Sequence, residues 1–196
     1  MTEEADILPE NAEKRIKYKL RNDKLPCMEH VTIIEELGRN RMVFRELLSG
    51  LSTAEYNWKP QADKWNLLEI ICHLYDEERE DFRARTKGVL EDPGKPLVPI
   101  DPVRWVTERR YVEQNYEIMI DKWTNERSLS LDWLRSLVNP AWDNVHRHPK
   151  LGAMSAGTFL SSWLAHDYLH IRQIVRLKYQ HLQYLTGESL DYAGTW

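Results

Sequence analysis

The sequence is poor in cysteine and in long apolar runs. Its 196 residues include two cysteines, Cys27 and Cys72, too few for the disulfide framework of a small secreted domain. No apolar run approaches the roughly 20 residues that a membrane-spanning helix needs. The chain also opens with acidic residues, whereas a secretory signal opens with basic ones. These absences predict a cytoplasmic protein with reduced thiols and no membrane partner.

Neither sign of charge is in large excess. The chain has 27 Lys and Arg against 31 Asp and Glu, with a formal net charge of -4. Proteins that bind nucleic acid usually carry excess positive charge that neutralises phosphates. We therefore expect no nucleic-acid partner. Basic residues do gather between Lys14 and Arg21, but acidic residues flank them, which is typical of a solvated segment. Residues 1–27 are thus predicted to form an N-terminal arm.

Hydrophobic residues, 42% of the chain, recur mainly at helical spacing, and the length suits one domain with one core. Four long segments show this spacing: residues 30–49, 66–88, 103–138 and 155–185. We expect the third of them to be interrupted near residues 125–130. We find no alternating pattern typical of strands. The sequence predicts an all-α four-helix bundle over residues 28–185 and a short tail over residues 186–196.

A Pro-rich segment separates the second predicted helix from the third. Residues 91–103 contain four prolines and one glycine, a density that excludes helix and disfavours a central strand. Antiparallel neighbouring helices need only a short turn. A connection of this length therefore predicts a long crossover, with helices two and three running in the same direction.

The second helix has a clear N-terminal signal. Asn66 is a suitable N-cap, and Glu69 stands three residues later, where its side chain can complete a capping box. This start fixes the register of the helix. It places His73 about two turns in, and Glu77 one turn further on the same face.

The fourth helix carries the most informative pattern. His166 and His170 lie one helical turn apart, and Gln173 falls on the same arc. Trp163 lies on that side too, so we expect the histidines to point inward. Histidines at i and i+4 can hold one metal ion through two ring nitrogens, but they need a third ligand from elsewhere. His73 is its natural source.

Two interpretations of these three histidines remain open. If helices two and four are neighbours, three neutral imidazoles can bind a zinc-like cation and leave its double charge to activate a water or a thiol. Alternatively, the histidines are core residues that form hydrogen bonds. Their partners would then be the backbone or one of three nearby side chains, Asp76, Asp167 and Tyr168.

The roles of the neighbouring residues are also left open. Glu77 is a fourth ligand, a general base or an ordinary carboxylate, and Gln173 either binds substrate or packs in the core. Asp167 lies away from the ligand arc and is expected to orient a neighbouring side chain or a helix end. Cys72 lies off the arc as well, so we do not expect it to act as a nucleophile.

The remaining histidines are predicted to lie outside the site. His30 begins the first helix and His181 follows the buried part of the fourth, so both are expected at the surface. His146 and His148 form a His-x-His pattern in the loop of residues 141–154. Neighbouring basic residues favour exposed or hydrogen-bonded rings there over metal ligands.

Three stretches together resemble the DinB-like (YfiT-like) superfamily. They are KWNLLEIICHLYDEE (residues 64–78), HPKLGAMS (148–155) and WLAHDYLHIRQI (163–174), and the resemblance covers residues 28–185. Asn66 stands where the family usually has a capping Ser. The resemblance implies a bundle of up-down-down-up order and homodimers. It also implies that His73, His166 and His170 bind a divalent metal such as nickel or zinc, with iron or manganese as further candidates.

The resemblance also bears on the reaction. Characterised members include transferases and an isomerase that use a low-molecular-weight thiol, bacillithiol or mycothiol, and others are classed as hydrolases. Our leading hypothesis is a metal-dependent enzyme that uses water or such a thiol on a small-molecule substrate. The competing hypothesis is a metal-binding or stress-related interaction bundle without catalysis. The family's damage-inducible name also raises DNA binding, which the net charge disfavours.

Overall fold

The computed structural model describes residues 28–148 and 151–194. The predicted arm, residues 1–27, lies outside this part of the chain, as does Cys27. In chain order the elements are α2 (His30–Leu48), α3 (Thr53–Asn57), α4 (Leu67–Glu77), the π-helical segment η1 (Glu78–Arg83), α5 (Ala84–Glu91), α6 (Pro102–Glu108), the 3-10 turn η2 (Tyr111–Glu113), α7 (Tyr116–Ser136), β1 (Val145–His148), β2 (Gly152–Ser155), α8 (Ala156–Thr186) and the 3-10 turn η3 (Asp191–Ala193).

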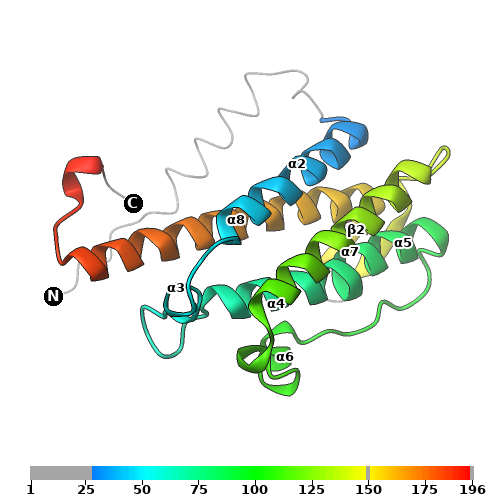
Figure 1. The fold of residues 1–196 in the computed structure, drawn as a ribbon. Helices are drawn as coiled ribbons and strands as arrows, with labels where there is room; N and C mark the ends of the chain where they lie inside the picture. The colour runs from blue at the N-terminus through cyan, green and yellow to red at the C-terminus, as the bar shows by residue number, and fades with distance from the viewer. Residues whose placement is uncertain (1–27, 149–150, 195–196) are drawn as a thin grey trace, which may run out of the picture.

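Within the described residues the long helices form four rods that pack side by side. Figure 1 shows their arrangement. The first is α2, the second is the continuous series α4, η1 and α5, the third is α7, and the fourth is α8. In this arrangement α2 packs on α7 and α8, α4 packs on α7, and α5 packs on α8. The predicted helical architecture is confirmed, whereas the predicted directions of the helices stay a prediction. Among the described residues, no helix combines the length and apolarity needed to cross a bilayer.

Apolar side chains from all four rods fill the interior. Two fully buried tryptophans, Trp123 of α7 and Trp163 of α8, are its largest members. The largest cluster joins α4, α6 and α7 to the middle of α8, and a second joins α2, η1, α7 and α8. The site described below lies between α4 and α8, and these clusters hold both rods in place.

The start of α4 follows the sequence signal. Asn66 is the N-cap; its Oδ1 accepts the Glu69 N–H at 2.8 Å, and Glu69 Oε2 accepts the Asn66 N–H at 2.8 Å. Both residues are buried. The capping box thus satisfies two N–H groups that the first turn leaves free.

The second rod is longer and less regular than expected. It ends at Glu91 instead of near Gly88, and its middle, Glu78–Arg83, is a π-helix. A π turn has poorer hydrogen-bond geometry than an α turn and usually persists where tertiary contacts compensate for it. Glu78, the first residue of this segment, is buried and bonded to side chains of two other rods.

The third predicted helix is divided at a different place. It is interrupted between α6 and α7, where Arg110 adopts a left-handed backbone with φ of 51° and Asn115 caps the next helix. The break expected near residues 125–130 is wrong, because α7 runs unbroken through them. Arg127 and Ser130 weaken the apolar pattern there, yet both are buried. Their polarity serves internal contacts and does not indicate a loop.

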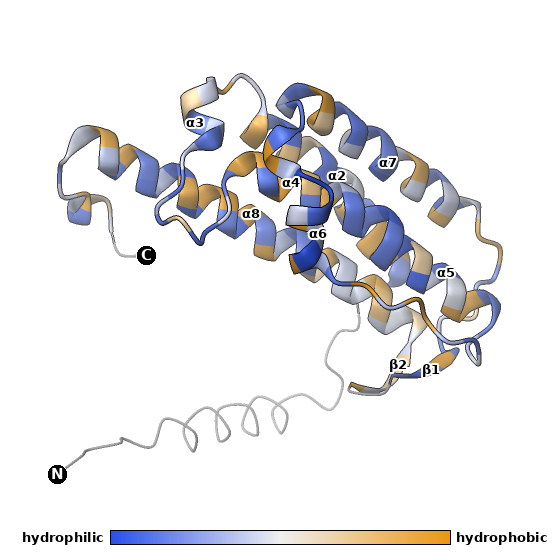
Figure 2. Cartoon of the chain, turned by 90° about the horizontal axis from the view of Figure 1, so that it is seen from below, coloured by the Kyte–Doolittle hydropathy of each residue, from blue (hydrophilic) through white to orange (hydrophobic). Residues whose placement is uncertain are grey.

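The expectation of no strand is also wrong. Strands β1 and β2 form an antiparallel hairpin in which Val145 pairs with Ser155 and His148 with Gly152. Figure 2 shows this hairpin at the same end of the bundle as α5. Asn144 fastens it there by donating to the backbone carbonyls of Val89 and Leu90. An isolated pair of four-residue strands has only marginal stability. Four residues are also too few to show a clear alternation of apolar and polar residues in the sequence.

Removing the Asn66 cap tests how strongly α4 depends on its capping box. We expect Asn66→Ala to lower the free energy of unfolding by about 1–2 kcal/mol, because a buried helix start loses its hydrogen-bond acceptor. Ser52→Ala is the matched control, since Ser52 forms the same capping box on the exposed five-residue helix α3. Urea denaturation measures both. An equal or larger loss for Ser52→Ala would contradict the prediction.

Candidate metal centre

Helices α4 and α8 bring three histidines to one point. One ligand nitrogen each of His73, His166 and His170 lies within 4.8 Å of the others. The closest approach is 3.0 Å, between His166 Nε2 and His170 Nε2. His73 and His170 are buried, and His166 is partly exposed. The i, i+4 pair on α8 and the single histidine of α4 therefore lie close together, and their role as metal ligands stays a prediction.

Glu77 joins this cluster from α4. Its Oε2 lies 3.0 Å from His166 Nε2 and 3.8 Å from His73 Nε2. Burial raises the pKa of Glu77, but the hydrogen bond with His166 and further favourable electrostatic contacts outweigh it and leave the pKa below its usual value. Glu77 is thus an ionised carboxylate at neutral pH, and its oxygen faces two of the three imidazoles.

The buried imidazoles are neutral. Burial lowers the pKa of both His73 and His170 to about 3, because a protonated ring loses its hydration there. A side-chain contact from Gln173 acts on His170 in the opposite direction without cancelling the shift. Neutral rings keep a free lone pair, which is the form that binds a metal.

The alternative partners of the histidines are engaged elsewhere. Asp76 accepts from Tyr111 Oη at 2.7 Å, and Asp167 is bonded to Arg127. Tyr168 is 49% exposed. The core interpretation requires one of these side chains or the backbone as a partner, whereas within the described residues the three rings contact one another, Glu77 and Gln173.

The residues fit a divalent cation. Three imidazole nitrogens with a carboxylate nearby form a donor set that zinc, nickel and related ions accept. The Nδ1 atoms of His73 and His170 are buried without a hydrogen-bond partner, so no strong bond turns either ring away from the cluster. Aromatic rings enclose it: the Trp65 ring lies 4.8 Å from that of His73, and the Phe82 ring 4.8 Å from that of His166.

Comparison with known proteins identifies the family. A sequence model of the DinB superfamily matches residues 36–174, which include every member of the cluster. The chain belongs to the DinB superfamily. A search of curated protein sequences gives no significant match.

Two solved structures share the DinB fold at low sequence identity. One is YfiT from Bacillus subtilis, described as a probable metal-dependent hydrolase with an unusual four-helix bundle topology. Its TM-score is 0.70 at 15% identity, and the match covers 86% of this chain and 93% of that one. The other is a mycothiol-dependent maleylpyruvate isomerase, with a TM-score of 0.62 at 11% identity, covering 75% of this chain and 61% of that one.

Gln173 lines a groove next to the histidine cluster. With Trp65 it lines a groove of about 340 Å³, which also contains Lys64, Arg176 and two further glutamines, Gln61 and Gln180. Trp65 contacts His73, and Gln173 follows His170 by one turn. The groove therefore adjoins the histidine cluster through Trp65 and through the turn of α8 after His170, although no residue of the cluster lines it.

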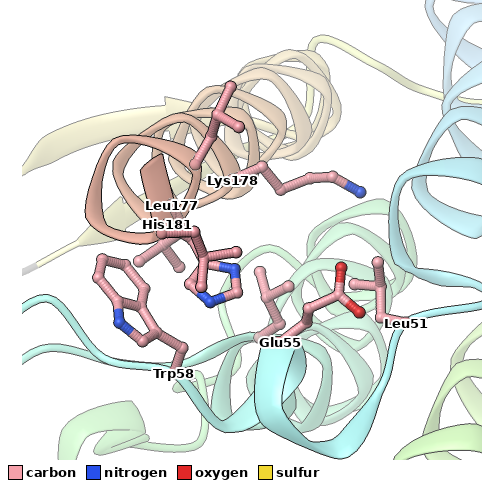
Figure 3. A pocket seen from close by; sticks show the side chains of 9 residues that line it. Leu51, Glu55, Trp58, Leu177, Lys178 and His181 are labelled. Atoms are coloured by element: carbon pink, nitrogen blue, oxygen red, sulfur yellow. The ribbon is translucent and has the colours of Figure 1, made fainter. Parts of the chain in front are cut away.

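A second cavity is separate from the cluster (Figure 3). It lies between α3 and the C-terminal part of α8, where Glu55 and Trp58 face Lys178 and His181. The expectation that His181 lies at the surface is only partly correct, because its ring contacts Trp58 at 5.0 Å and is half-buried. No residue of this cavity belongs to the histidine cluster.

The other histidines are occupied locally. His146 Nδ1 lies 3.0 Å from the Pro93 carbonyl oxygen, and His148 Nδ1 accepts the Leu151 N–H at 3.1 Å. The predicted preference for hydrogen bonds over metal ligation is consistent with these contacts. His30 makes no side-chain cap bond, and its half-buried ring stacks on Trp142.

Cys72 is not suited to nucleophilic chemistry. Its side chain is buried, and burial raises the pKa of the thiol to about 12. A thiol with this pKa has almost no reactive thiolate at neutral pH. The expectation that Cys72 is not a nucleophile agrees with this environment.

Sequence reasoning missed two residues beside the cluster. The position of Phe82 in the sequence does not predict a contact with the histidines, yet the π segment brings its ring against His166. Arg127 was not singled out at all, although it is fully buried and bonded to the residues that follow Glu77 and His166. A charged residue within an otherwise apolar helix face was the available signal for Arg127.

The depressed histidine pKa values predict a pH-dependent stability of the metal-free protein. A histidine with a pKa of about 3 in the folded state and about 6.5 in the unfolded state binds more protons when unfolded. The free energy of unfolding should therefore fall as the pH drops from 7 to 5, by about 1–2 kcal/mol for each histidine.

Urea denaturation of chelator-treated protein at each pH measures this effect. The variant His73→Gln should lose its share of the pH slope, whereas His181→Gln, outside the cluster, should keep the full slope. Identical slopes for His73→Gln and the unchanged chain would refute the assignment of buried, neutral His73.

Proposed function

We propose that this protein is a metal-dependent enzyme in which His73, His166 and His170 hold one divalent cation, zinc or nickel in the first place and iron or manganese as alternatives. It acts on a small-molecule substrate by hydrolysis or by transfer of a low-molecular-weight thiol. The observation that carries the proposal is the convergence of three histidine nitrogens, from two helices, within 4.8 Å. Membership of the DinB superfamily supports it.

The proposed reaction needs a Lewis acid and a general base. A divalent cation supplies Lewis-acid chemistry and lowers the pKa of a water or thiol nucleophile. Glu77 is ionised and lies within hydrogen-bond distance of His166, so in this proposal its carboxylate takes the proton from that nucleophile. Phe82 and Trp65 line the cluster and limit the water that can compete with the substrate.

The groove beside the cluster provides the substrate side of the site. Gln173 lines it together with two basic residues, Lys64 and Arg176. In this proposal Gln173 donates a hydrogen bond to the substrate or to a thiol cofactor. The two structural neighbours, a probable metal-dependent hydrolase and a mycothiol-dependent isomerase, are consistent with either nucleophile.

Metal analysis of three variants tests the ligand set. We expect the purified protein to retain about one equivalent of zinc or nickel and the variants His73→Ala and His166→Ala to retain almost none, because two imidazoles hold a cation poorly. His181→Ala is the matched control on α8 and should retain the full amount. Elemental analysis after dialysis measures this. Stoichiometric metal in both site variants would contradict the ligand set.

A carboxamide at position 77 tests the role of Glu77. We expect Glu77→Gln to keep its metal and its fold but to hydrolyse an activated ester about 100-fold more slowly, because the amide cannot accept the proton. Glu80→Gln, on the same rod but paired with Arg109, is the control and should retain its rate. Loss of metal from Glu77→Gln would instead make Glu77 a ligand.

Cobalt-loaded protein can distinguish a thiol nucleophile from water. Cobalt-loaded protein mixed with cysteine should develop a near-ultraviolet sulfur-to-cobalt absorption band if a thiol is the natural nucleophile. No band, together with ester hydrolysis, would assign the site to water. Stoichiometric metal with neither signal would favour the non-catalytic metal-binding bundle.

A further inference from the structure

A fully buried arginine joins the four rods behind the histidine cluster. Arg127 of α7 is 1% exposed, and each of its five N–H groups has an acceptor. Two bonds of 2.9 Å reach the Glu78 carboxylate, two of 2.7 and 2.8 Å reach the Asp167 carboxylate, and one of 3.1 Å reaches the Leu37 carbonyl oxygen. Asn40 of α2 donates a further bond to Asp167 at 3.1 Å.

The two carboxylates are sequence neighbours of the cluster residues. Glu78 directly follows Glu77, and Asp167 directly follows His166. Successive residues on a helix point about 100° apart, so on each rod one side chain faces the histidines while the next faces Arg127. A rotation of either rod about its axis would therefore have two effects at once. It would break the bidentate bonds of Arg127, and it would separate Glu77 from His166.

Aromatic contacts connect Arg127 to the histidines through a second route. Trp163 Nε1 donates to Glu78 Oε2 at 3.0 Å, and the Phe82 ring stacks on the Trp163 ring. Phe82 in turn contacts His166. The π segment that begins at Glu78 contains Phe82, so the irregular backbone aims both Glu78 and Phe82 at these partners.

Stability alone is a weak reason for this arrangement. Burying three charged groups carries a large desolvation cost, and well-packed apolar side chains in place of a buried ion triad are often as stable or more so. The planar guanidinium does supply strict geometry, since its fork bonds two carboxylates at defined angles. Arg127, Glu78 and Asp167 also leave one formal negative charge in the interior beside the proposed cation.

We propose that Arg127, Glu78 and Asp167 are positioning residues for the proposed metal centre. They set the rotation of α4 and α8 at which Glu77 and the three histidines meet, and thereby the affinity and coordination geometry of the cation. This inference rests on the proposed function. It predicts that a small change in the fork geometry of Arg127 weakens the site without removing any ligand.

The variant Arg127→Lys tests this inference, because lysine keeps the charge but cannot bond both carboxylates bidentately. We expect it to bind zinc about 10–100-fold more weakly in competition with a chromophoric chelator, and to change the visible absorption bands of the cobalt-loaded protein. Arg83→Lys is the matched control. Arg83 also joins the second rod to α7, through Glu126 and Ser130, but within residues 28–148 and 151–194 it forms no hydrogen bond with α8.

A second, milder variant covers the case in which Arg127→Lys does not fold. Trp163→Phe removes one donor to Glu78 and keeps an aromatic ring, so it should weaken zinc binding in the same direction and shift the cobalt bands. If both folded variants show the affinity and spectrum of Arg83→Lys and differ only in melting temperature, the cluster is purely structural and the inference is wrong.

Histidine-selective NMR of the metal-free protein separates this inference from the proposed function. Changed ring signals of His73 and His166 in Trp163→Phe, but not in Arg83→Lys, would support positioning even if the unchanged chain bound no zinc. Zinc binding by the unchanged chain with unaltered ring signals and affinity in Trp163→Phe would overturn positioning and leave the proposed metal centre standing.

Discussion

The structure depends on satisfying polar side chains inside a helical bundle. Four rods pack through apolar clusters, yet their centre holds Arg127, Glu78 and Asp167 in full burial. A buried charge without a partner would cost several kcal/mol, so the rods can associate only in a register that completes these bonds. Glu77 and His166, which belong to the histidine cluster, directly precede Glu78 and Asp167, so the same register brings the cluster together.

The Arg127 cluster and the histidine cluster differ in whether their polar atoms already have partners. Every N–H of Arg127 has an acceptor, which makes that cluster closed and rigid. In the histidine cluster, by contrast, the rings lie close together, His73 and His170 are neutral, and Glu77 is ionised. A cluster whose hydrogen bonds are all satisfied can fix the orientation of neighbouring side chains, whereas nitrogen lone pairs without a partner are available to a cation. The Arg127 cluster therefore lies directly behind the histidine cluster, and both belong to the part of the chain that matches the DinB superfamily.

Helix formation and the ligand arc were predictable because they are local properties. The capping box at Asn66 and the i, i+4 spacing of His166 and His170 each involve residues within one or two turns. Where local pattern and tertiary context disagreed, prediction was wrong. Arg127 and Ser130 looked like a break in α7, and the hairpin of β1 and β2 lacks the alternation of an independent strand pair. In both places distant partners satisfy the polar groups.

The sequence by itself determined the mainly helical character of the chain, the cap at Asn66 and the faces on which His73, Glu77, His166 and His170 lie, since helical periodicity follows from local backbone geometry. Only the tertiary structure decided that α4 and α8 bring those faces within hydrogen-bond distance, that a π turn places Phe82 against His166, and that Arg127 bonds the residues behind both. These depend on contacts between positions far apart in the chain, where desolvation and packing of whole helices, and not local propensity, select the arrangement.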